Sequence, residues 1–472
     1  MPYHGEFAKH QGTKNVLKSS GVKDMLQVIQ FVITDTEYER IDDFVISEKQ
    51  KLDTTKLKNI FVIDGSKLET PVFDKSEAKL CLFNINQCIV DTKKFESYLK
   101  NPFPHPSEYK EIAKDINVTF FLPTKGMRTQ QHGSEEEFFR STLYKMFKNI
   151  QNPINNWLNE KGIEVNHKES ILDTYLELLN HTDNIKNAPH PCLDCRRSGR
   201  AFSLKSFKKE DGSWHSDISC KCENNPKVLY PTDLLGFHEQ LNNENSNEAL
   251  TTQVMLVVER ILLINLLHIL IKNNQIDLIN ESIFLTDGAL AIYSHASWLS
   301  QAINKEIIEL KQKYPLLILG IEKSGNFVDF FKKIDNHFAT EPLKAGLLFF
   351  LEDKYIREHI KIQDTSVFYG ENNYFGKKLF YKNKKGKLFV INVAFEDEAD
   401  RVADLNNRNT DSYRSKIERL NDIVVLLDNF SSQSYDNALS VVSLANDGAA
   451  LSSSSLTKKL LSDFVNGLIN ER

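Results

Sequence analysis

The chain has 472 residues, a length typical of roughly two to four domains or of one large core with insertions. It contains 59 Lys and Arg against 64 Asp and Glu, a formal net charge of −5, and 41% of its residues are hydrophobic. This composition excludes a disordered chain, a collagen and a mainly basic protein that coats DNA. It does not exclude a nucleic-acid enzyme, which needs only a local basic channel.

Cysteine content and apolar stretches indicate the compartment. Six cysteines in a chain of this length are too few for a disulfide scaffold. Residues 1–23 contain no apolar run of the kind that a signal peptide needs. Polar and charged residues interrupt the most apolar stretch, 254–271, so we do not expect it to span a membrane. We therefore expect a soluble, cytoplasmic protein without membrane association.

Three strands are predicted near the start of the chain. Ile60–Ile63 is a strand that ends at Asp64-Gly65-Ser66, and the next two cover Lys79–Val90 and Asn117–Leu122. Because no long helix separates these strands, we expect an antiparallel start to a sheet. The polar residue Ser134 precedes three glutamates and an apolar run, a pattern typical of a capped helix. A further helix is predicted over 170–179.

The second half predicts a strand–helix–strand unit. Thr252–Lys272 is apolar on nearly every side, which is typical of a buried helix. The strand Ile283–Thr286 then ends in Asp287-Gly288, the helix Ser294–Lys313 follows, and the strand Leu316–Ile321 completes the unit as the parallel half of a mixed sheet. Beyond it we expect a hairpin of strands 377–382 and 388–395. The short apolar run 423–427 fits either a strand or a helix.

These elements predict an α/β fold, a mixed sheet flanked by helices with an inserted region between its two halves. The expected parts are an N-terminal extension at 1–50, the first part of the core at 51–130, the insertion at 131–245, the second part of the core at 246–395 and a C-terminal part that completes it at 396–472.

Two strands run directly into Asp-Gly, as Phe61 to Ser66 (FVIDGS) and as Phe284 to Ala289 (FLTDGA). Asp64 and Asp287 would then project from a sheet edge, where ligands collect in α/β folds. Two neighbouring carboxylates repel unless a cation lies between them, and Mg²⁺ and Mn²⁺ prefer carboxylate oxygens. Taken singly, each Asp-Gly pair also fits an ordinary turn.

Two further residues extend this pattern. Glu259 is a charged residue in the apolar helix, and such residues are rarely buried unless they are paired or bound to a metal. Its alternative role is a salt bridge with Arg260. Lys323 follows the next predicted strand, where it could steady a scissile phosphate. Three acids and a lysine at a sheet edge suit two-metal phosphodiester hydrolysis.

Four of the six cysteines form two close pairs, Cys192–Cys195 and Cys220–Cys222. This arrangement fits a zinc ribbon, in which four thiolates hold a structural Zn²⁺ in tetrahedral geometry. A catalytic zinc is not expected, because four cysteines leave no open coordination position. Four reduced thiols without a metal are the alternative.

Two basic clusters could contact a nucleic acid. One lies between the cysteine pairs, where basic residues alternate with aromatic ones, and the other lies on the hairpin at 377–387. Solvated surfaces, or in the first case a docking patch for a partner, are the alternatives. The expected contacts are Arg196, Arg197, Arg200, Lys377, Lys378, Lys382, Lys384 and Lys385.

A series of motifs resembles the NurA family of nucleases in order and spacing. It runs from Ile63-Asp64-Gly65-Ser66 through the strand 79–91 and the segment 230–239 (YPTDLLGFHE) to Val258-Glu259-Arg260. It continues with the segments 285–290 (LTDGAL) and 320–324 (GIEKS), Tyr369-Gly370, 374–377 (YFGK), 426–428 (LLD) and 435–451. The resemblance covers most of the chain from about residue 55 to about residue 460.

The resemblance implies an RNase H-like core related to the PIWI-type nucleases and Mn²⁺-dependent exo- and endonuclease activity on DNA. By position, Asp64, Glu259 and Asp287 would bind the Mn²⁺ or Mg²⁺ ions, Lys323 would lie near the phosphate, and Tyr435 would match the family's C-terminal tyrosine. The implied partners are DNA, a HerA-like hexameric ATPase that translocates DNA, and a second copy of the chain in a homodimer. The implied roles are DNA end processing (repair) or anti-phage defence.

One departure from the family pattern motivates a second hypothesis. Ala445 is followed by Asn446, where the family has His, and an amide does not exchange protons as an imidazole does. The alternative function is therefore a non-catalytic DNA-binding adaptor or clamp for a HerA-like ATPase. A nuclease of the same fold that acts on RNA is a third possibility.

Overall fold

The computed structural model describes residues 57–72, 77–100, 112–182, 190–198, 207–209, 213–220, 222, 226–242, 244–337, 345–351, 356–360, 369–405, 417–432 and 437–451. The predicted N-terminal extension lies outside these residues.

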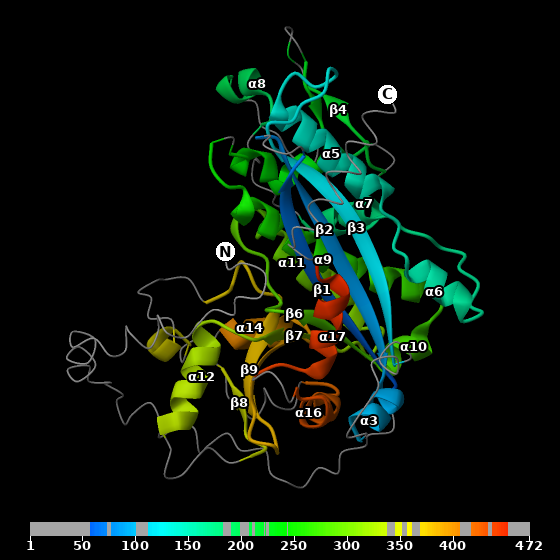
Figure 1. The fold of residues 1–472 in the computed structure, drawn as a ribbon, viewed down its shortest axis with the longest axis vertical. Coiled ribbons are helices and arrows are strands. Elements are labelled where there is room, and N and C mark those ends of the chain that lie inside the picture. The colour runs from blue at the N-terminus through cyan, green and yellow to red at the C-terminus, as the bar shows by residue number, and fades with distance from the viewer. Residues whose placement is uncertain are drawn as a thin grey trace, which may run out of the picture. The chain divides into compact units, whose positions relative to one another are not determined.

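An eight-stranded mixed sheet forms the centre of the described fold, in the order β3-β2-β1-β6-β7-β10-β9-β8 (Figure 1). Strands β1, β2 and β3 are antiparallel, β6 and β7 lie parallel to β1, and β10, β9 and β8 return to antiparallel pairing. The strands are β1 (Asn59–Pro71), β2 (Lys79–Asp91), β3 (Ala113–Lys125), β6 (Ser282–Asp287), β7 (Ile318–Glu322), β8 (Leu348–Phe350), β9 (Gly376–Lys382) and β10 (Leu388–Ala394). The antiparallel start and the parallel strand–helix–strand unit are thus confirmed.

The sequence predicted that the first strand ends at Asp64, but strand β1 does not end there. It continues to Pro71 because β2 pairs with it along its whole length, from Asn59 opposite Asp91 to Pro71 opposite Lys79. The parallel partner β6 leaves earlier, after Ile63 has paired with Thr286. Asp64 therefore lies at the point where β1 loses one neighbour and keeps the other.

The sheet separates two hydrophobic cores, as the two-residue period of a strand requires. Phe61 and Ile63 of β1 contribute to one core, whereas Ile60 and Val62 contribute to the other. The first core contains helices α5 (Glu135–Asn149), α6 (Ile154–Glu160), α7 (Ile171–Leu179), α9 (Glu248–Lys272), α10 (Ile276–Asn280) and α11 (Leu299–Lys311). The second contains α3 (Thr92–Lys100), α16 (Leu420–Asn429) and α17 (Ser440–Ala449). The fold therefore has helices on both faces of one sheet.

The remaining elements are short or lie at the far edge of the sheet. Helix α12 (Asn326–His337) contacts β10, and α14 (Glu398–Leu405) contacts β9. The inserted region also holds α8 (Leu193–Arg197), a two-stranded sheet of β4 (Ile218–Ser219) and β5 (Val228–Leu229), and the 3-10 helices η4 (Pro231–Leu235) and η5 (Phe237–Gln240). The 3-10 helix η6 (Ser294–Ala296) follows β6, and η7 (Ile356–Ile360) is a single π-helical turn.

Helix α9 is long and apolar enough to cross a bilayer by length and composition. Of its most apolar window, 83% is buried inside the protein, as expected of the core helix that the sequence predicted.

Two predicted elements take a different form. The apolar run 423–427 belongs to helix α16, so the strand alternative does not apply. The predicted helix 294–313 divides into η6 and α11, because the left-handed Ser294 (φ 63°) begins a separate turn.

Candidate metal centre at the edge of the parallel strands

Asp64 and Asp287 occupy equivalent places on two neighbouring parallel strands. Each follows directly on a paired residue, since Ile63 of β1 lies opposite Thr286 of β6. The register therefore brings the two carboxylates to the same edge of the sheet, as the repeated Asp-Gly pattern predicted. The charge of Asp287 acts on Asp64 strongly enough to raise its pKa.

The Asp64 carboxylate is buried, and only one of its two oxygens accepts a hydrogen bond. The Gly65 amide donates a hydrogen bond to Oδ1 over 2.9 Å, whereas Oδ2 is buried with no partner in the described structure. Burial, and after it the Asp287 charge, raises the pKa of Asp64 to about 7. A buried carboxylate oxygen without a donor is costly, so this oxygen is suited to bind a cation.

Glu259 reaches the same place from helix α9. It is buried, and its Oε1 lies 2.5 Å from the position that a Cβ on Gly65 would take. Burial raises the pKa of Glu259 to about 8, the charges of Asp64 and Asp287 add to the effect, and that of Arg260 opposes it. The three acids therefore form one electrostatic group, drawn from two strands and one helix.

Arg260 supports this group from inside the protein. Its side chain is fully buried, and its NH2 group donates to the backbone carbonyls of Asp287 (3.2 Å) and Ala289 (2.9 Å). Its NH1 group lies 3.6 Å from Glu259 Oε2. Arg260 thus pins the turn that carries Asp287 as well as opposing the charge of Glu259. The sequence suggested only the salt bridge.

Lys323 is at the end of the next parallel strand, as predicted. Its Nζ donates to Asp287 Oδ2 over 2.8 Å, and the contact is about a quarter exposed on each side. The preceding residue, Glu322, does not belong to the acidic group, because it accepts hydrogen bonds from Lys378 and from Asn392. Lys323 is therefore a partly exposed cation that pairs with Asp287.

The donor set at this edge fits a hard divalent cation. The pKa values of Asp64 and Glu259 are strongly raised, and Oδ2 of Asp64 is buried without a partner. Protein groups therefore offset the negative charge of the ionised carboxylates only in part, and a divalent cation would offset the rest. The ligand atoms of the three acids do not all lie within 4.8 Å of one another. Within the described residues two other groups do, the four cysteines and the set Glu169, Glu177 and His268.

The end of helix α17 contacts strands β1 and β2 next to Asp64. Ser66 Oγ donates to the Ala449 carbonyl over 2.6 Å, and Asn84 Nδ2 donates to it over 2.9 Å. Asn446, one turn earlier on this helix, is exposed. Tyr435 lies outside the described residues, so its place relative to the acids stays a prediction.

The four predicted cysteine ligands converge. Cys222 Sγ lies 3.4 Å from Cys192 Sγ and 3.1 Å from Cys195 Sγ, and all four sulfurs fall within 4.8 Å of one another. The Lys227 amide donates to Cys220 Sγ over 3.0 Å. Cys81 and Cys88, by contrast, are buried on β2, as the sequence indicated for core residues.

The predicted DNA contacts divide into buried and exposed residues. Lys377, Lys378 and Lys382 are buried in ion pairs, so they cannot reach a phosphate in this arrangement. Their partners are Asp400, Glu322 and Asp335. These three lysines therefore do not belong to the basic hairpin surface that the sequence predicted.

The exposed members of the predicted set are Lys384, Lys385, Arg196 and Arg197. Lys384 Nζ lies 3.6 Å from Asp428, and Arg196 forms an ion pair with Glu239. Arg200 lies outside the described residues.

Comparison with known proteins gives two solved structures of one family. The chain is similar to the crystal structure of the NurA nuclease from Sulfolobus solfataricus, with a TM-score of 0.35 and 9% identity over 99% of this chain and 98% of that one. It is also similar to a crystal structure of NurA, with a TM-score of 0.31 and 11% identity over 98% of each chain. This is the family that the sequence motifs resemble. No family model and no curated protein matches the sequence.

Proposed function

We propose that the protein is a metal-dependent DNA nuclease of the NurA type that hydrolyses phosphodiester bonds. The observation that carries this proposal is the unpartnered, buried Oδ2 of Asp64 beside the carboxylates of Asp287 and Glu259. The strand arrangement, three antiparallel strands followed by two parallel ones, supports an RNase H-like core.

Asp64, Glu259 and Asp287 would hold the catalytic Mn²⁺ or Mg²⁺ ions. Bound there, a pair of divalent ions activates water and stabilises the leaving oxygen. The protein's own part is to fix the acids on rigid elements, with Arg260 pinning the Asp287 turn from behind. Lys323, about a quarter exposed beside Asp287, would contact the non-bridging oxygens of a scissile phosphate.

Substitution of the acids tests this proposal. Asp64→Asn and Asp287→Asn should abolish cleavage of labelled linear DNA in Mn²⁺ while the protein stays folded, as judged by circular dichroism. Asp277→Asn is the matched control, because Asp277 is an exposed aspartate on α10, outside the acidic group. Full activity in both site variants would exclude the assignment, and parallel RNA substrates test the RNA-directed alternative.

We further propose that the nuclease acts as a homodimer docked on a HerA-like hexameric ATPase. The motivation is the net charge of −5 and the burial of three hairpin lysines, which leave little basic surface for avid binding of DNA by the chain alone. Analytical ultracentrifugation of the chain alone gives its oligomeric state. Co-purification with such an ATPase, compared with the chain alone on the same DNA, tests whether cleavage depends on the partner.

Asn446 favours one second candidate, a non-catalytic adaptor. It is exposed on the helix whose end borders Asp64-Gly65-Ser66, and it stands where the resemblance leads one to expect His. The adaptor predicts DNA binding without cleavage under every metal and partner condition, and it predicts no gain on Asn446→His. A nuclease impaired by the amide predicts that Asn446→His increases the rate.

We also propose a structural Zn²⁺ at the cysteine cluster. Four thiolates would complete the tetrahedral coordination of such an ion and contribute to folding rather than to catalysis. The convergence of all four sulfurs and the backbone amide directed at Cys220 support this proposal.

A further inference from the structure

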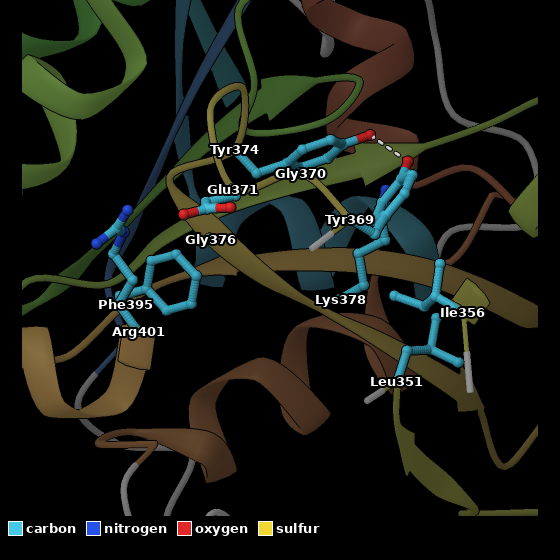
Figure 2. A pocket seen from close by; sticks show the side chains of 10 residues that line it. All are labelled: Leu351, Ile356, Tyr369, Gly370, Glu371, Tyr374, Gly376, Lys378, Phe395 and Arg401. Carbon is cyan, nitrogen blue, oxygen red and sulfur yellow. Dashed lines mark hydrogen bonds between the residues drawn. The ribbon is translucent and has the colours of Figure 1, made fainter. Parts of the chain in front are cut away.

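Three tyrosines meet beyond the end of β6, close to the acidic group. Tyr374 lies between the other two, with its hydroxyl 3.0 Å from that of Tyr293 and 2.9 Å from that of Tyr369. The rings of Tyr293 and Tyr374 are edge to face, with centroids 6.1 Å apart. Figure 2 shows the side chains of Tyr369 and Tyr374 directed toward one another through their hydroxyls. We call Tyr293, Tyr369 and Tyr374 the tyrosine cluster.

Backbone pairing ties this cluster to the strand that carries Asp287. Ala291 forms a β-bridge with Tyr374, the Ile292 amide donates to the Asn373 carbonyl, and the Phe375 amide donates to the Leu290 carbonyl. Ser300 Oγ of α11 also donates to the Asn373 carbonyl over 2.7 Å. The position of Tyr293 is therefore fixed relative to the acids by several independent contacts.

Tyr293 is partly exposed to solvent despite these constraints. The residue is 41% exposed, one of few large apolar residues in the described structure with that exposure. The next residue, Ser294, has the left-handed φ of 63°, a conformation that costs energy in a non-glycine residue and is often found at functional sites. Tyr293 is thus partly exposed on this turn while its ring packs edge to face on Tyr374.

The segment that carries Tyr293 begins at the acidic group. Tyr293 follows Asp287 by six residues, and the buried Arg260 guanidinium donates to the Asp287 and Ala289 carbonyls of this segment. On the inner side, the Lys378 ammonium lies 4.6 Å from the centroid of the Tyr374 ring and pairs with Glu322. Tyr293 therefore lies on the segment that leads away from Asp287, held in place by its hydroxyl contact with Tyr374.

We propose that Tyr293 stacks on a nucleobase of a single-stranded DNA end and so positions that strand at the carboxylates. This inference rests on the proposed nuclease function and adds the form of the substrate. A single strand exposes the faces of its bases, whereas a duplex hides them in its own stack, and aromatic side chains bind such faces with little regard to sequence. The hydroxyl contact with Tyr374 fixes the ring in advance, which lowers the entropy lost on binding.

Binding without cleavage tests the role of the ring. The probe is a single-stranded oligodeoxynucleotide with 2-aminopurine near one end, measured in EDTA so that hydrolysis does not contribute. Tyr293→Ala and Tyr293→Leu should weaken binding by roughly 5- to 150-fold and abolish the fluorescence change caused by stacking. Tyr293→Phe keeps the ring and should bind within about twofold of the natural protein. Tyr374→Phe removes the same hydroxyl contact from the other side, so it should bind as Tyr293→Phe does, within about twofold of the natural protein.

Two results would overturn the inference. Wild-type affinity in Tyr293→Ala and Tyr293→Leu would show that no base stacks there, and an equal loss in Tyr293→Phe would show that the hydroxyl rather than the ring matters. Thermal unfolding of each variant shows whether a loss of binding comes only from a loss of stability. Tyr293→Leu serves the same purpose, because it keeps an apolar side chain at this position. Cleavage of duplex DNA with no stacking signal would refute the inference alone, whereas stacking without any cleavage would refute the nuclease proposal alone.

Discussion

Gly65 leaves the space that the Glu259 carboxylate occupies. A Cβ at position 65 would stand 2.5 Å from Glu259 Oε1, closer than such atoms approach in folded proteins, and 3.2 Å from Met255 Cγ, a tight contact. The glycine has no left-handed backbone angle, so its need is for room and not for conformational freedom. The Asp-Gly pair on β1 is thus a packing requirement between a strand and the helix that crosses it.

Gly65→Ala should therefore displace Glu259 and weaken the metal site. We expect a loss of about 1–3 kcal/mol in stability from the inserted methyl group and a shift of Mn²⁺ half-saturation to higher concentration. Thermal unfolding with and without Mn²⁺ measures both effects. Gly133→Ala is the matched control, because its Cβ would meet only Glu137 Oε2, at an ordinary 3.4 Å. Equal behaviour of the two variants would mean that Glu259 does not depend on this space.

The acidic group should make the metal-free protein less stable as pH rises. The pKa of Asp64 is raised to about 7 and that of Glu259 to about 8, whereas the same carboxyls in the unfolded chain titrate near pH 4. Between those values the folded state holds more protons than the unfolded state, so the free energy of unfolding falls with pH. We expect a loss on the order of 6 kcal/mol from pH 5 to pH 8.5 in EDTA.

Mn²⁺ should reverse this trend, because it competes with protons for the same oxygens. Its stabilising effect, measured as the shift in unfolding temperature, should be larger at pH 8.5 than at pH 5.5. Glu259→Gln should flatten the pH dependence, whereas Glu281→Gln on the protein surface should not. A metal-free protein whose stability rises steadily over this range would contradict the site's electrostatics.

The sequence predicted the strands and the buried helix because these depend on local pattern. The apolar runs of β1 and β2, and the charged Glu259 in an apolar helix, are visible without a structure. The extension of β1 past Asp64 was missed because it depends on a partner strand, which a local Asp-Gly turn signal does not show. Lys377, Lys378 and Lys382 of the hairpin were misplaced for the same reason, because Lys377 pairs with Asp400 and Lys382 pairs with Asp335, both distant in the chain. Lys384 and Lys385 are exposed, as predicted.

The cysteine cluster should hold one Zn²⁺ per chain, measured by elemental analysis of the purified protein. Cys195→Ser should lower the zinc content and the unfolding temperature, because Cys195 Sγ lies 3.1 Å from Cys222 Sγ at the centre of the group. Cys88→Ala removes a buried thiol of β2 outside the cluster, and it should leave the zinc content unchanged. A protein without zinc that is as stable as the zinc-loaded form would favour four free thiols.

His268 should be one of the most important residues for stability outside the acidic site. Its Nδ1 lies 2.9 Å from Glu169 Oε1 and its Nε2 lies 2.9 Å from Glu306 Oε1, so both ring nitrogens face carboxylates and both must carry protons. Burial alone would lower the pKa of His268, but these hydrogen bonds raise it well above its usual value. The imidazolium thus joins α9 to α11 and to Glu169, which lies just before α7.

His268→Gln would leave two carboxylates without their shared cation in the interior. We expect a loss of about 3–5 kcal/mol, measured by urea unfolding at pH 7, against no more than a small change for the exposed His295→Gln. The pKa of Glu169 lies near 2 in the natural protein, despite burial, because His268 and Lys272 stabilise its charge. The stability that the ionised Glu169 contributes to the folded state is therefore present above pH 4.5, and it is lost as pH falls toward 2. His268→Gln should accordingly shift acid unfolding to higher pH, and an unchanged acid midpoint would show that the network does not stabilise the fold.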